Sequence, residues 1–172
     1  MNNKIAIFPG SFDPPTNGHL NIIIRALNLF PKIMVAVTNN LNKNHWFSLE
    51  ERINFLEEIT KNLKNVQILS FSGLLANYVK EKKIFIIIRG LRIVSDFEYE
   101  LQMATINKKL NNDIETIFLI PDYSYSFLTS ALIRELALLE SDISNFIPKC
   151  IEKELKERAF LIKKKNLKVC KK

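Results

Sequence analysis

The stretch "KIAIFPGSFDPPTNGHLNIIIRAL", residues 4–27, joins an apolar run to an amphipathic segment through a loop that contains glycine and proline. Lys4–Phe8 is short and nearly all apolar, which is typical of a strand covered on both faces in a parallel sheet. From His19 to Phe30 apolar residues recur at helical spacing. The loop holds two of the chain's four glycines and one of its two histidines. The stretch therefore predicts a strand, a loop with a special role, and a helix.

The same alternation of strand and helix continues along the chain. Further buried strands are expected at Ile33–Thr38, Val66–Phe71, Ile84–Ile88 and Thr116–Ile120. Helices are expected at His19–Phe30, Ser48–Leu63, Leu74–Lys82, Ser95–Leu110, Thr129–Leu139 and Pro148–Lys164. Two of them are expected to begin with capping boxes, in which Ser48 pairs with Glu51 and Ser95 with Glu98. The order predicts an α/β fold: a single Rossmann-like dinucleotide-binding domain, with a five-stranded parallel sheet, helices on both faces and a C-terminal helical segment.

Size and composition fit one globular domain. The chain has 172 residues, of which 47% are hydrophobic and 25% charged, enough to bury a substantial core. We expect the domain to span residues 1–162. Residues 163–172 are expected to form a basic C-terminal tail, solvated or frayed, with six lysines and no acidic residue.

Targeting and metal signals are weak. The apolar runs are far shorter than the roughly 18 residues that a membrane helix needs, and the first residues do not resemble a signal peptide. Cys150 and Cys170 are far apart and the chain has only two histidines, which suits a reducing cytoplasm and argues against a zinc site. The net charge of +7 is compatible with nucleic acid, an acidic surface or a polyphosphate substrate.

The unusual residues gather at one edge of the predicted sheet. In a parallel sheet, ligands bind outside the carboxyl ends of the strands. The segments that leave those ends are "PGSFDPPTNGH", "NNLNKNHWF", "SGLLANY", "RGLRIVSDFEYE" and "PDYSYSFLTS". They contain all four glycines, both histidines, Lys43, Arg89 and Arg92. Ordinary turns explain each glycine alone, but not why the opposite edge has none.

This composition suits a phosphate ligand. Glycine permits positive φ and close approach of the backbone, and a helix N-terminus attracts phosphate. Lys43, Arg89 and Arg92 would add cationic donors. The loop matches neither the Walker A spacing nor G-x-G-x-x-G, so the residues alone predict a nucleotide or phosphorylated substrate without naming it.

Four motifs carry a resemblance to a known family. "TNGH" at 16–19, after "PGSFDP", resembles the T/H-x-G-H signature of the nucleotidyltransferase superfamily, and "TSALIRE" at 129–135 resembles its second signature, I-S-S-T-x-x-R. "HWFSLEER" at 45–52 and "RGLRIVSDFEYE" at 89–100 closely resemble the bacterial phosphopantetheine adenylyltransferases. The resemblance covers nearly the whole domain in order.

The resemblance implies a reaction and its partners. AMP would pass from ATP to 4′-phosphopantetheine, with Mg²⁺, to give dephospho-coenzyme A (dephospho-CoA) and pyrophosphate in coenzyme A biosynthesis. The acceptor phosphate is already anionic near neutral pH, because its second pKa is about 6, so no general base is needed. The resemblance further implies a cytoplasmic homohexamer, dephospho-CoA or CoA as product or feedback ligand, and no nucleic-acid or membrane partner.

The resemblance also assigns roles to residues. His19 is expected to contact the α-phosphate and stabilise the transition state. The expected ATP contacts are Ser11, Phe12, His19, Gly90, Leu91, Arg92, Glu100, Tyr125, Ser126, Phe127, Leu128, Thr129, Ser130 and Ala131. The expected acceptor contacts are Ser11, Lys43, Leu75 and Arg89. No metal-binding side chain is expected. Thr129 and Ala131 depart from the second signature, and Ala131 keeps only a backbone N–H.

Plainer explanations remain open for these residues. His19 could be a helix-start residue bonded to the backbone, Leu75 a core residue, and Lys43 and Arg89 solvated cations. Glu100 and Arg134 could belong to charged helix faces. Two other functions also remain: a sister nucleotidyltransferase that acts on nicotinamide mononucleotide or makes a CDP-alcohol, and a nucleic-acid-binding module suggested by the basic tail, although that tail has no interleaved aromatic residues.

Overall fold

A parallel five-stranded sheet forms the centre of the computed structural model, which describes residues 5–39 and 44–169. The strands are β1 (Ile5–Gly10), β2 (Lys32–Thr38), β3 (Val66–Phe71), β4 (Ile86–Gly90) and β5 (Glu115–Leu119). Every neighbouring pair is parallel, and the order across the sheet is β3-β2-β1-β4-β5. The predicted α/β class and the presence of five strands are confirmed, although β4 lies two residues later than the predicted Ile84–Ile88 and β5 one residue earlier than the predicted Thr116–Ile120.

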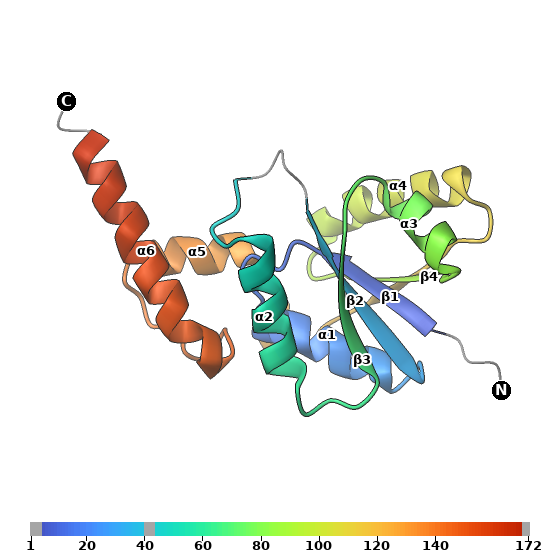
Figure 1. The fold of residues 1–172 in the computed structure, drawn as a ribbon, viewed down its shortest axis with the longest axis horizontal. Helices are drawn as coiled ribbons and strands as arrows, with labels where there is room; N and C mark the ends of the chain where they lie inside the picture. The colour runs from blue at the N-terminus through green and yellow to red at the C-terminus, as the bar shows by residue number, and fades with distance from the viewer. Residues whose placement is uncertain (1–4, 40–43, 170–172) are drawn as a thin grey trace.

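Helices follow each strand, as Figure 1 shows. They are α1 (Asn17–Leu27), α2 (Leu49–Thr60), α3 (Leu75–Lys82), α4 (Val94–Leu110), α5 (Ser130–Leu138) and α6 (Lys149–Val169), with a short 3-10 turn, η1 (Tyr123–Tyr125), before α5. The box of Ser48 and Glu51 is confirmed by bonds of 2.7 and 3.1 Å between each side chain and the other residue's N–H.

Two expectations about helix ends are wrong. The helix predicted from Ser95 begins at Val94 with Ile93 as its N-cap, so Ser95 and Glu98 are not the pair that starts it. The first turn closes instead through the Asp96 N–H, which donates to the Ile93 carbonyl at 3.0 Å. The last helix, expected to end at Lys164, continues to Val169; the division into a domain of residues 1–162 and a tail of residues 163–172 stays a prediction.

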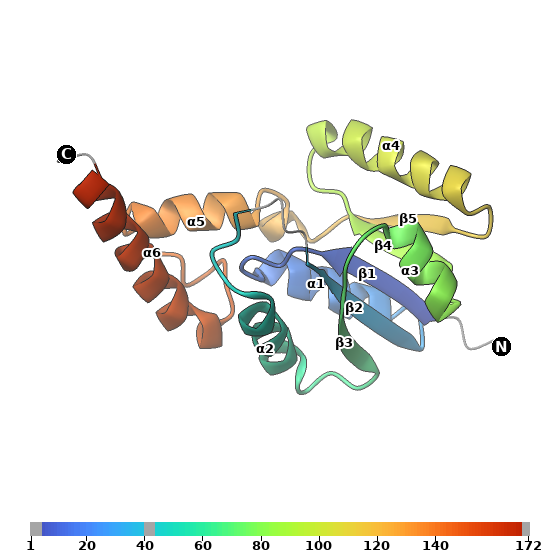
Figure 2. The same ribbon diagram turned by 45° about the horizontal axis from the view of Figure 1, so that its top comes forward.

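Both faces of the sheet are covered, which explains why its strands are so apolar. On one face, Ile23 of α1 and Leu56 of α2 pack with Phe8 and Val35. On the other face, Val79 of α3 packs with Ile7 and other side chains. Successive strand residues point to opposite faces, so a sheet with helices on both sides needs apolar residues at nearly every position. Figure 2 shows α1 and α4 on opposite sides of the sheet.

The last two helices form a third apolar cluster beyond the sheet. Ile133 of α5 and Leu155 of α6 pack with Phe47 and Leu128, and Figure 1 shows both helices beyond one end of the sheet. Within the part of the chain that the structure describes, no helix is long and apolar enough to cross a membrane.

The strand order fixes where a ligand can bind. From β1 the chain crosses to β2 on one side, whereas β4 pairs with β1 on its other side. Helices from these two directions leave a crevice at the carboxyl ends of the central strands, the usual ligand site of such sheets. The loops after β1 and β4 border this crevice.

Candidate active site

Two adjoining clefts lie at the carboxyl ends of β1 and β4. The first, which we call the His19 cleft, is lined by Ser11, His19, Arg92, Leu128 and their neighbours. The second, the Leu75 cleft, runs between α3 and α4 and is lined mainly by apolar side chains. The residues that line both clefts are Pro9, Gly10, Ser11, Arg89 and Glu100. A ligand in one cleft would therefore meet a ligand in the other at these residues.

The loop after β1 turns sharply around a buried aromatic ring. Phe12 has a φ of 50° and is 2% exposed. A Cβ on Gly10 would lie 2.9 Å from the Cζ of Phe12, so glycine leaves room for the ring over the strand end. Gly18 lines the His19 cleft, and its Cβ would lie 3.4 Å from the Thr16 hydroxyl oxygen. The glycine with a positive φ among the described residues is Gly73, at 82°. Gly10 therefore serves close packing rather than positive φ, whereas a Cβ on Gly18 would make only ordinary contact.

His19 is held at the third position of α1 by its own helix cap. The Thr16 backbone N–H donates to His19 Nδ1 at 3.0 Å, while the Thr16 hydroxyl oxygen accepts from the His19 backbone N–H at 3.3 Å. The ring of Phe12 meets the imidazole edge-on, with centroids 5.1 Å apart. Because Nδ1 accepts a hydrogen bond, it carries a lone pair, which assigns the ring proton to Nε2. His19 lines the cleft, so Nε2–H is the ring donor available to a bound anion.

The surroundings keep this ring neutral. Burial, together with the nearby positive charges of Arg92 and Arg89, lowers the pKa of His19 to about 4. Burial disfavours the charged imidazolium, and like charges add to that effect. At neutral pH His19 therefore offers a hydrogen-bond donor without a net charge. It is a poor proton acceptor, because its acceptor nitrogen is already bonded to Thr16.

Arg89 and Glu100 form a fixed pair at the junction of the clefts. Arg89 Nε and Nη2 donate to the two Glu100 carboxylate oxygens at 2.7 and 2.6 Å, and Nη1 donates to the Pro9 carbonyl at 2.8 Å. This bidentate geometry aligns the plane of the guanidinium. The Arg89 side chain remains 29% exposed. Arg89 is therefore not a free surface cation. In this structure Glu100 orients the Arg89 guanidinium.

Arg92 is oriented in a similar way on the His19 side. Its Nε donates to Asp96 at 2.9 Å, and its Nη1 donates to the Leu128 carbonyl at 2.9 Å. The second bond joins the loop after β4 to the segment before α5. Arg92 is 31% exposed at its side chain, so its guanidinium keeps a face toward the cleft that it lines.

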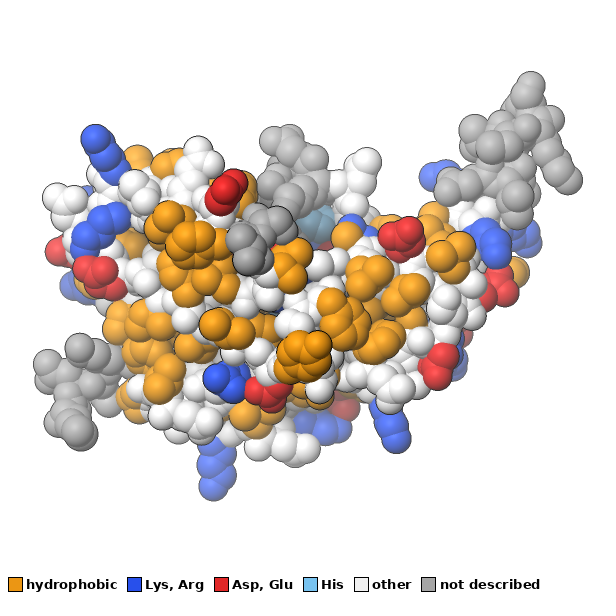
Figure 3. Space-filling view, turned by 180° about the vertical axis from the view of Figure 1, so that it is seen from behind, with side chains coloured by type: hydrophobic (Ala, Val, Ile, Leu, Met, Phe, Trp, Pro, Cys, Tyr) orange, Lys and Arg blue, Asp and Glu red, His pale blue; other side chains and the backbone are white. Residues whose placement is uncertain are grey.

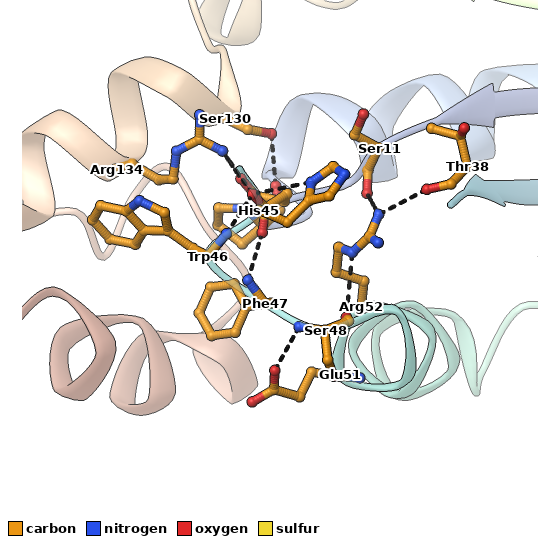
Figure 4. Close-up of polar contacts among 12 residues, drawn as sticks. Ser11, Thr38, His45, Trp46, Phe47, Ser48, Glu51, Arg52, Ser130 and Arg134 are labelled. Carbon is orange, nitrogen blue, oxygen red and sulfur yellow. Dashed lines mark hydrogen bonds and ion pairs between the residues drawn. The ribbon is translucent and has the colours of Figure 1, made fainter. Parts of the chain in front are cut away.

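A group of contacts behind the clefts was not predicted from the sequence. Asp13, 1% exposed, accepts bonds from the backbone N–H groups of Trp46 and Phe47 at 2.9 and 3.0 Å. Arg134 of α5 donates to the Asp13 carboxylate at 2.8 Å, and Arg52 of α2 donates to the Ser11 carbonyl at 2.7 Å. We call Asp13, Trp46, Phe47, Arg52 and Arg134 the brace (Figure 4).

The brace joins three segments that are distant in the chain: the loop after β1, residues 45–52 and α5. Ser130 adds a further bond from its hydroxyl to the Pro14 carbonyl at 2.8 Å. Burial lowers the pKa of Arg52, and the carboxylate of Asp13 partly offsets this. The sequence signal for this role is that Arg52 lies with Leu49, Ile53 and Leu56 on one face of α2.

The remaining residues expected to contact ATP are divided between the cleft and its surroundings. Tyr125, Leu128 and Gly90 line the His19 cleft. The residues outside its lining are Leu91, Ser126, Phe127, Thr129, Ser130 and Ala131. The Thr129 hydroxyl oxygen caps α5 by accepting from the Leu132 N–H at 2.9 Å. Their contacts with ATP stay predictions.

The acceptor-side residues are also only partly placed. Leu75, at the start of α3, lines the second cleft together with Arg89 and Ser11. Lys43 lies outside the described residues. Within the described ranges, no three His, Cys, Asp or Glu side chains come together as a metal site.

Known proteins match this chain in both sequence and fold. A family model described as cytidylyltransferase-like matches residues 7–136. A phosphopantetheine adenylyltransferase from Clostridium perfringens is 46% identical over 155 residues, which cover 90% of this chain and 94% of the relative. Enzymes of the same name from Syntrophomonas wolfei and Thermodesulfovibrio yellowstonii are each 47% identical, over 90% of this chain and 96% and 97% of their own length.

A solved structure shares the fold at lower sequence identity. It comes from Vibrio parahaemolyticus, is described as a nicotinate-nucleotide adenylyltransferase, and is 20% identical to this chain. The likeness has a TM-score of 0.68 and covers 92% of this chain and 96% of that one. It supports the arrangement of sheet and helices described above.

Proposed function

Because the chain belongs to the family of the phosphopantetheine adenylyltransferases, we propose that it transfers AMP from ATP to 4′-phosphopantetheine. The products are dephospho-coenzyme A and pyrophosphate, and the reaction belongs to coenzyme A biosynthesis. An oxygen of the acceptor phosphate forms a bond to the α-phosphorus of ATP, and the bond from that phosphorus to the bridging oxygen of pyrophosphate breaks. The protein is a nucleotidyltransferase.

One observation on the structure supports this function above others: two clefts of different character meet at Ser11 and Arg89. The His19 cleft carries Arg92 and the N-terminus of α1, which suit the phosphates of ATP. The Leu75 cleft is lined mainly by apolar side chains, which suits the pantetheine arm. Arg89 lies where the acceptor phosphate would approach the α-phosphorus, and its guanidinium is oriented beforehand by Glu100.

We infer that His19 acts as a neutral hydrogen-bond donor in this reaction. Charge on the α-phosphoryl oxygens is redistributed as the acceptor attacks, and a donor held in place stabilises that change without reorganisation. The acceptor phosphate is anionic near neutral pH, since its second pKa is about 6, and so it needs no base. A ring with a pKa lowered to about 4 and its proton on Nε2 has the chemistry of a donor.

We propose that Mg²⁺ takes part as a complex with ATP. The carboxylates that line or adjoin the clefts do not form a preformed metal site: Glu100 is bonded to Arg89, and Asp96 to Arg92. Mg²⁺ is commonly held by substrate phosphates and water, with few protein ligands. The cation would neutralise part of the triphosphate charge, and the chain's own contribution is to hold the phosphates.

We also propose a cytoplasmic homohexamer that binds dephospho-CoA or CoA as product or feedback ligand. Association is supported by α4, which exposes apolar side chains along its length, and Figure 3 shows hydrophobic side chains gathered over that end of the molecule. The exposed apolar residues of α4 are Phe97, Tyr99, Leu101, Ile106 and Leu110. Sedimentation at several protein concentrations would test the assembly, since a monomer throughout would contradict it.

The function is tested by pyrophosphate release with ATP, Mg²⁺ and 4′-phosphopantetheine. Parallel reactions replace the acceptor by nicotinate or nicotinamide mononucleotide, or by a phosphoalcohol with CTP in place of ATP. We expect turnover with 4′-phosphopantetheine and ATP, and formation of dephospho-coenzyme A in equal amount to pyrophosphate. Turnover confined to a mononucleotide acceptor or to CTP would contradict the proposal and favour a sister activity.

A further inference from the structure

Arg52 lies behind the active site rather than in it. Its side chain belongs to α2 and is 1% exposed. Its Nη1 donates to the Ser11 carbonyl at 2.7 Å and to the Thr38 carbonyl at 3.0 Å, and its Nε donates to the Ser48 carbonyl at 3.2 Å (Figure 4). Burying a guanidinium is costly unless its donors are satisfied. Here the Ser11, Thr38 and Ser48 carbonyls accept hydrogen bonds from its Nη1 and Nε.

The position of the Ser11 and Thr38 carbonyls shows what the Arg52 contact does. β1 and β2 pair in parallel as far as Gly10 and Val37. Ser11 and Thr38 are the next residue of each segment, where the β1–β2 ladder ends and Ser11 leaves the sheet, while Thr38 is still paired with Phe71 of β3. Nη1 of Arg52 bonds to both carbonyls, so the guanidinium connects the two strands one residue beyond their last pairing.

The position of Ser11 would affect how both substrates are bound. It lines the His19 cleft and the Leu75 cleft, and Thr38 lines the second of them. A shift of the Ser11 backbone would therefore move one bound phosphate relative to the other. Adenylyl transfer depends on that relative position, because the acceptor oxygen must be aligned with the α-phosphorus.

We propose that Arg52 is a positioning residue that fixes Ser11 between the two substrate sites, an inference that rests on the proposed function. It touches neither substrate and acts through the Ser11 and Thr38 carbonyls. The planar fork of the guanidinium is what suits it to the task, because lysine has no equivalent of the Nε donor to Ser48. The role predicts a loss in turnover without a matching loss in the affinity for either substrate.

The test compares Arg52→Met and Arg52→Lys with the full-length chain, at temperatures where circular dichroism shows each protein folded. Thr60→Val is the matched control, because Thr60 is also buried on α2 and loses one hydrogen bond, from its hydroxyl to the Leu56 carbonyl at 2.7 Å. The measurements are kcat from pyrophosphate release and the Kd of ATP and of 4′-phosphopantetheine by calorimetry.

We expect Arg52→Met to lower kcat about 100-fold, the scale of a small misplacement of reacting groups. Each Kd should change by less than about fivefold, the scale of one net hydrogen bond. Arg52→Lys should lose about tenfold in kcat, since it keeps the charge but not the fork. Thr60→Val should stay within about twofold of the unsubstituted chain in kcat.

Several results would overturn the inference. One is a folded Arg52→Met variant with unchanged kcat, and another is a Kd that rises as steeply as kcat falls. If Arg52→Met does not fold, unchanged kcat in Arg52→Lys decides against the role. Loss of folding in both variants would make Arg52 a residue of stability alone. Failure of the unsubstituted chain to release pyrophosphate would instead refute the proposed function, so the two failures are distinguishable.

Discussion

Arg89 and Arg92, which line the clefts, differ from Arg52 in the brace in how accessible their guanidinium groups are to a ligand. Arg89 and Arg92 each bond to a carboxylate and to one backbone carbonyl, and their side chains are 29% and 31% exposed. Arg52 is 1% exposed and bonds to three carbonyls. The cleft arginines are oriented but accessible to an anion, whereas the buried one is used to hold backbone in place. Ligand binding and support of the backbone are therefore the work of different side chains around the loop after β1.

His19→Ala should separate the two regions most sharply, because it removes a donor from the cleft and leaves the brace intact. We expect turnover to fall by roughly 100- to 1000-fold, the loss typical of one preorganised transition-state donor. The affinity for ATP should fall only about three- to tenfold, since one hydrogen bond is lost. Steady-state kinetics beside an ATP titration measure both effects.

Circular dichroism controls for folding of this variant, because the imidazole also belongs to the cap of α1. Near-normal turnover in a folded protein would remove His19 from the transition state. A loss of ATP affinity as large as the loss of rate would assign it to ground-state binding.

Arg89→Ala should weaken 4′-phosphopantetheine more than ATP. A charge-assisted contact is worth about 1.5–3 kcal/mol, which is roughly a 10- to 150-fold rise in the Kd of the acceptor. The variant also leaves Glu100 without its partner, so Arg89→Ala combined with Glu100→Gln is the control for an unpaired carboxylate. Equal losses for both substrates in calorimetry would contradict the assignment of Arg89 to the acceptor phosphate.

Gly10→Ala should affect stability, in contrast to Gly18→Ala. A Cβ at residue 10 meets two atoms of the buried Phe12 ring at 2.9 and 3.0 Å, whereas at residue 18 the nearest atom is 3.4 Å away. Overpacking of this kind costs about 1–3 kcal/mol, so thermal or urea unfolding should show a lower free energy of unfolding for Gly10→Ala. Equal stability of the two variants would mean that Phe12 does not hold the loop as described.

Truncation after Lys163 should have the smallest effect. The removed residues include the end of α6, which extends to Val169, and the lining of both clefts comes from residues before 129. Turnover by the folded, shortened chain should stay within about twofold, because chain ends tolerate change better than the rest of a domain. A loss of more than about tenfold would give these residues a role in the reaction.

The sequence predicted most of the sheet, because each strand is apolar on both faces and bounded by polar loops. β3 has the predicted bounds, Val66–Phe71. The start of α4 was missed because Ser95 and Glu98 have the spacing of a capping box, while the first turn closes on Ile93 instead. Local patterns compete at helix ends, so boundaries there depend on contacts that the sequence does not display.

The brace was missed for a different reason. Arg52 and Asp13 are charged, and a charged residue in a sequence is normally expected at the surface. The partners of Arg52 Nη1 and Nε become apparent only in the folded chain, because the loop after β1, the end of β2 and α2 come together there. The cleft residues were predicted through motifs that bring chemical types together, whereas the brace depends largely on side-chain bonds to backbone groups, which have no such sequence signature.

The charge state of His19 links the cleft's geometry to its function. Its pKa is lowered from 6.5 to about 4 in the folded chain, so the unfolded chain binds more protons between these values. The free energy of unfolding should therefore rise with pH across this window and fall as the pH drops toward 4. Above that window His19 is neutral and should add no inflection to the activity profile near neutral pH.

The most direct test of the neutral donor is a nitrogen NMR titration of the chain labelled at histidine. Only two histidines are present, and His45→Gln assigns the signals. We predict that His19 is in the Nε2–H form at neutral pH, with Nδ1 unprotonated, and that it takes up a proton only as the pH approaches about 4. An imidazolium or an Nδ1–H tautomer at pH 7 would contradict the account.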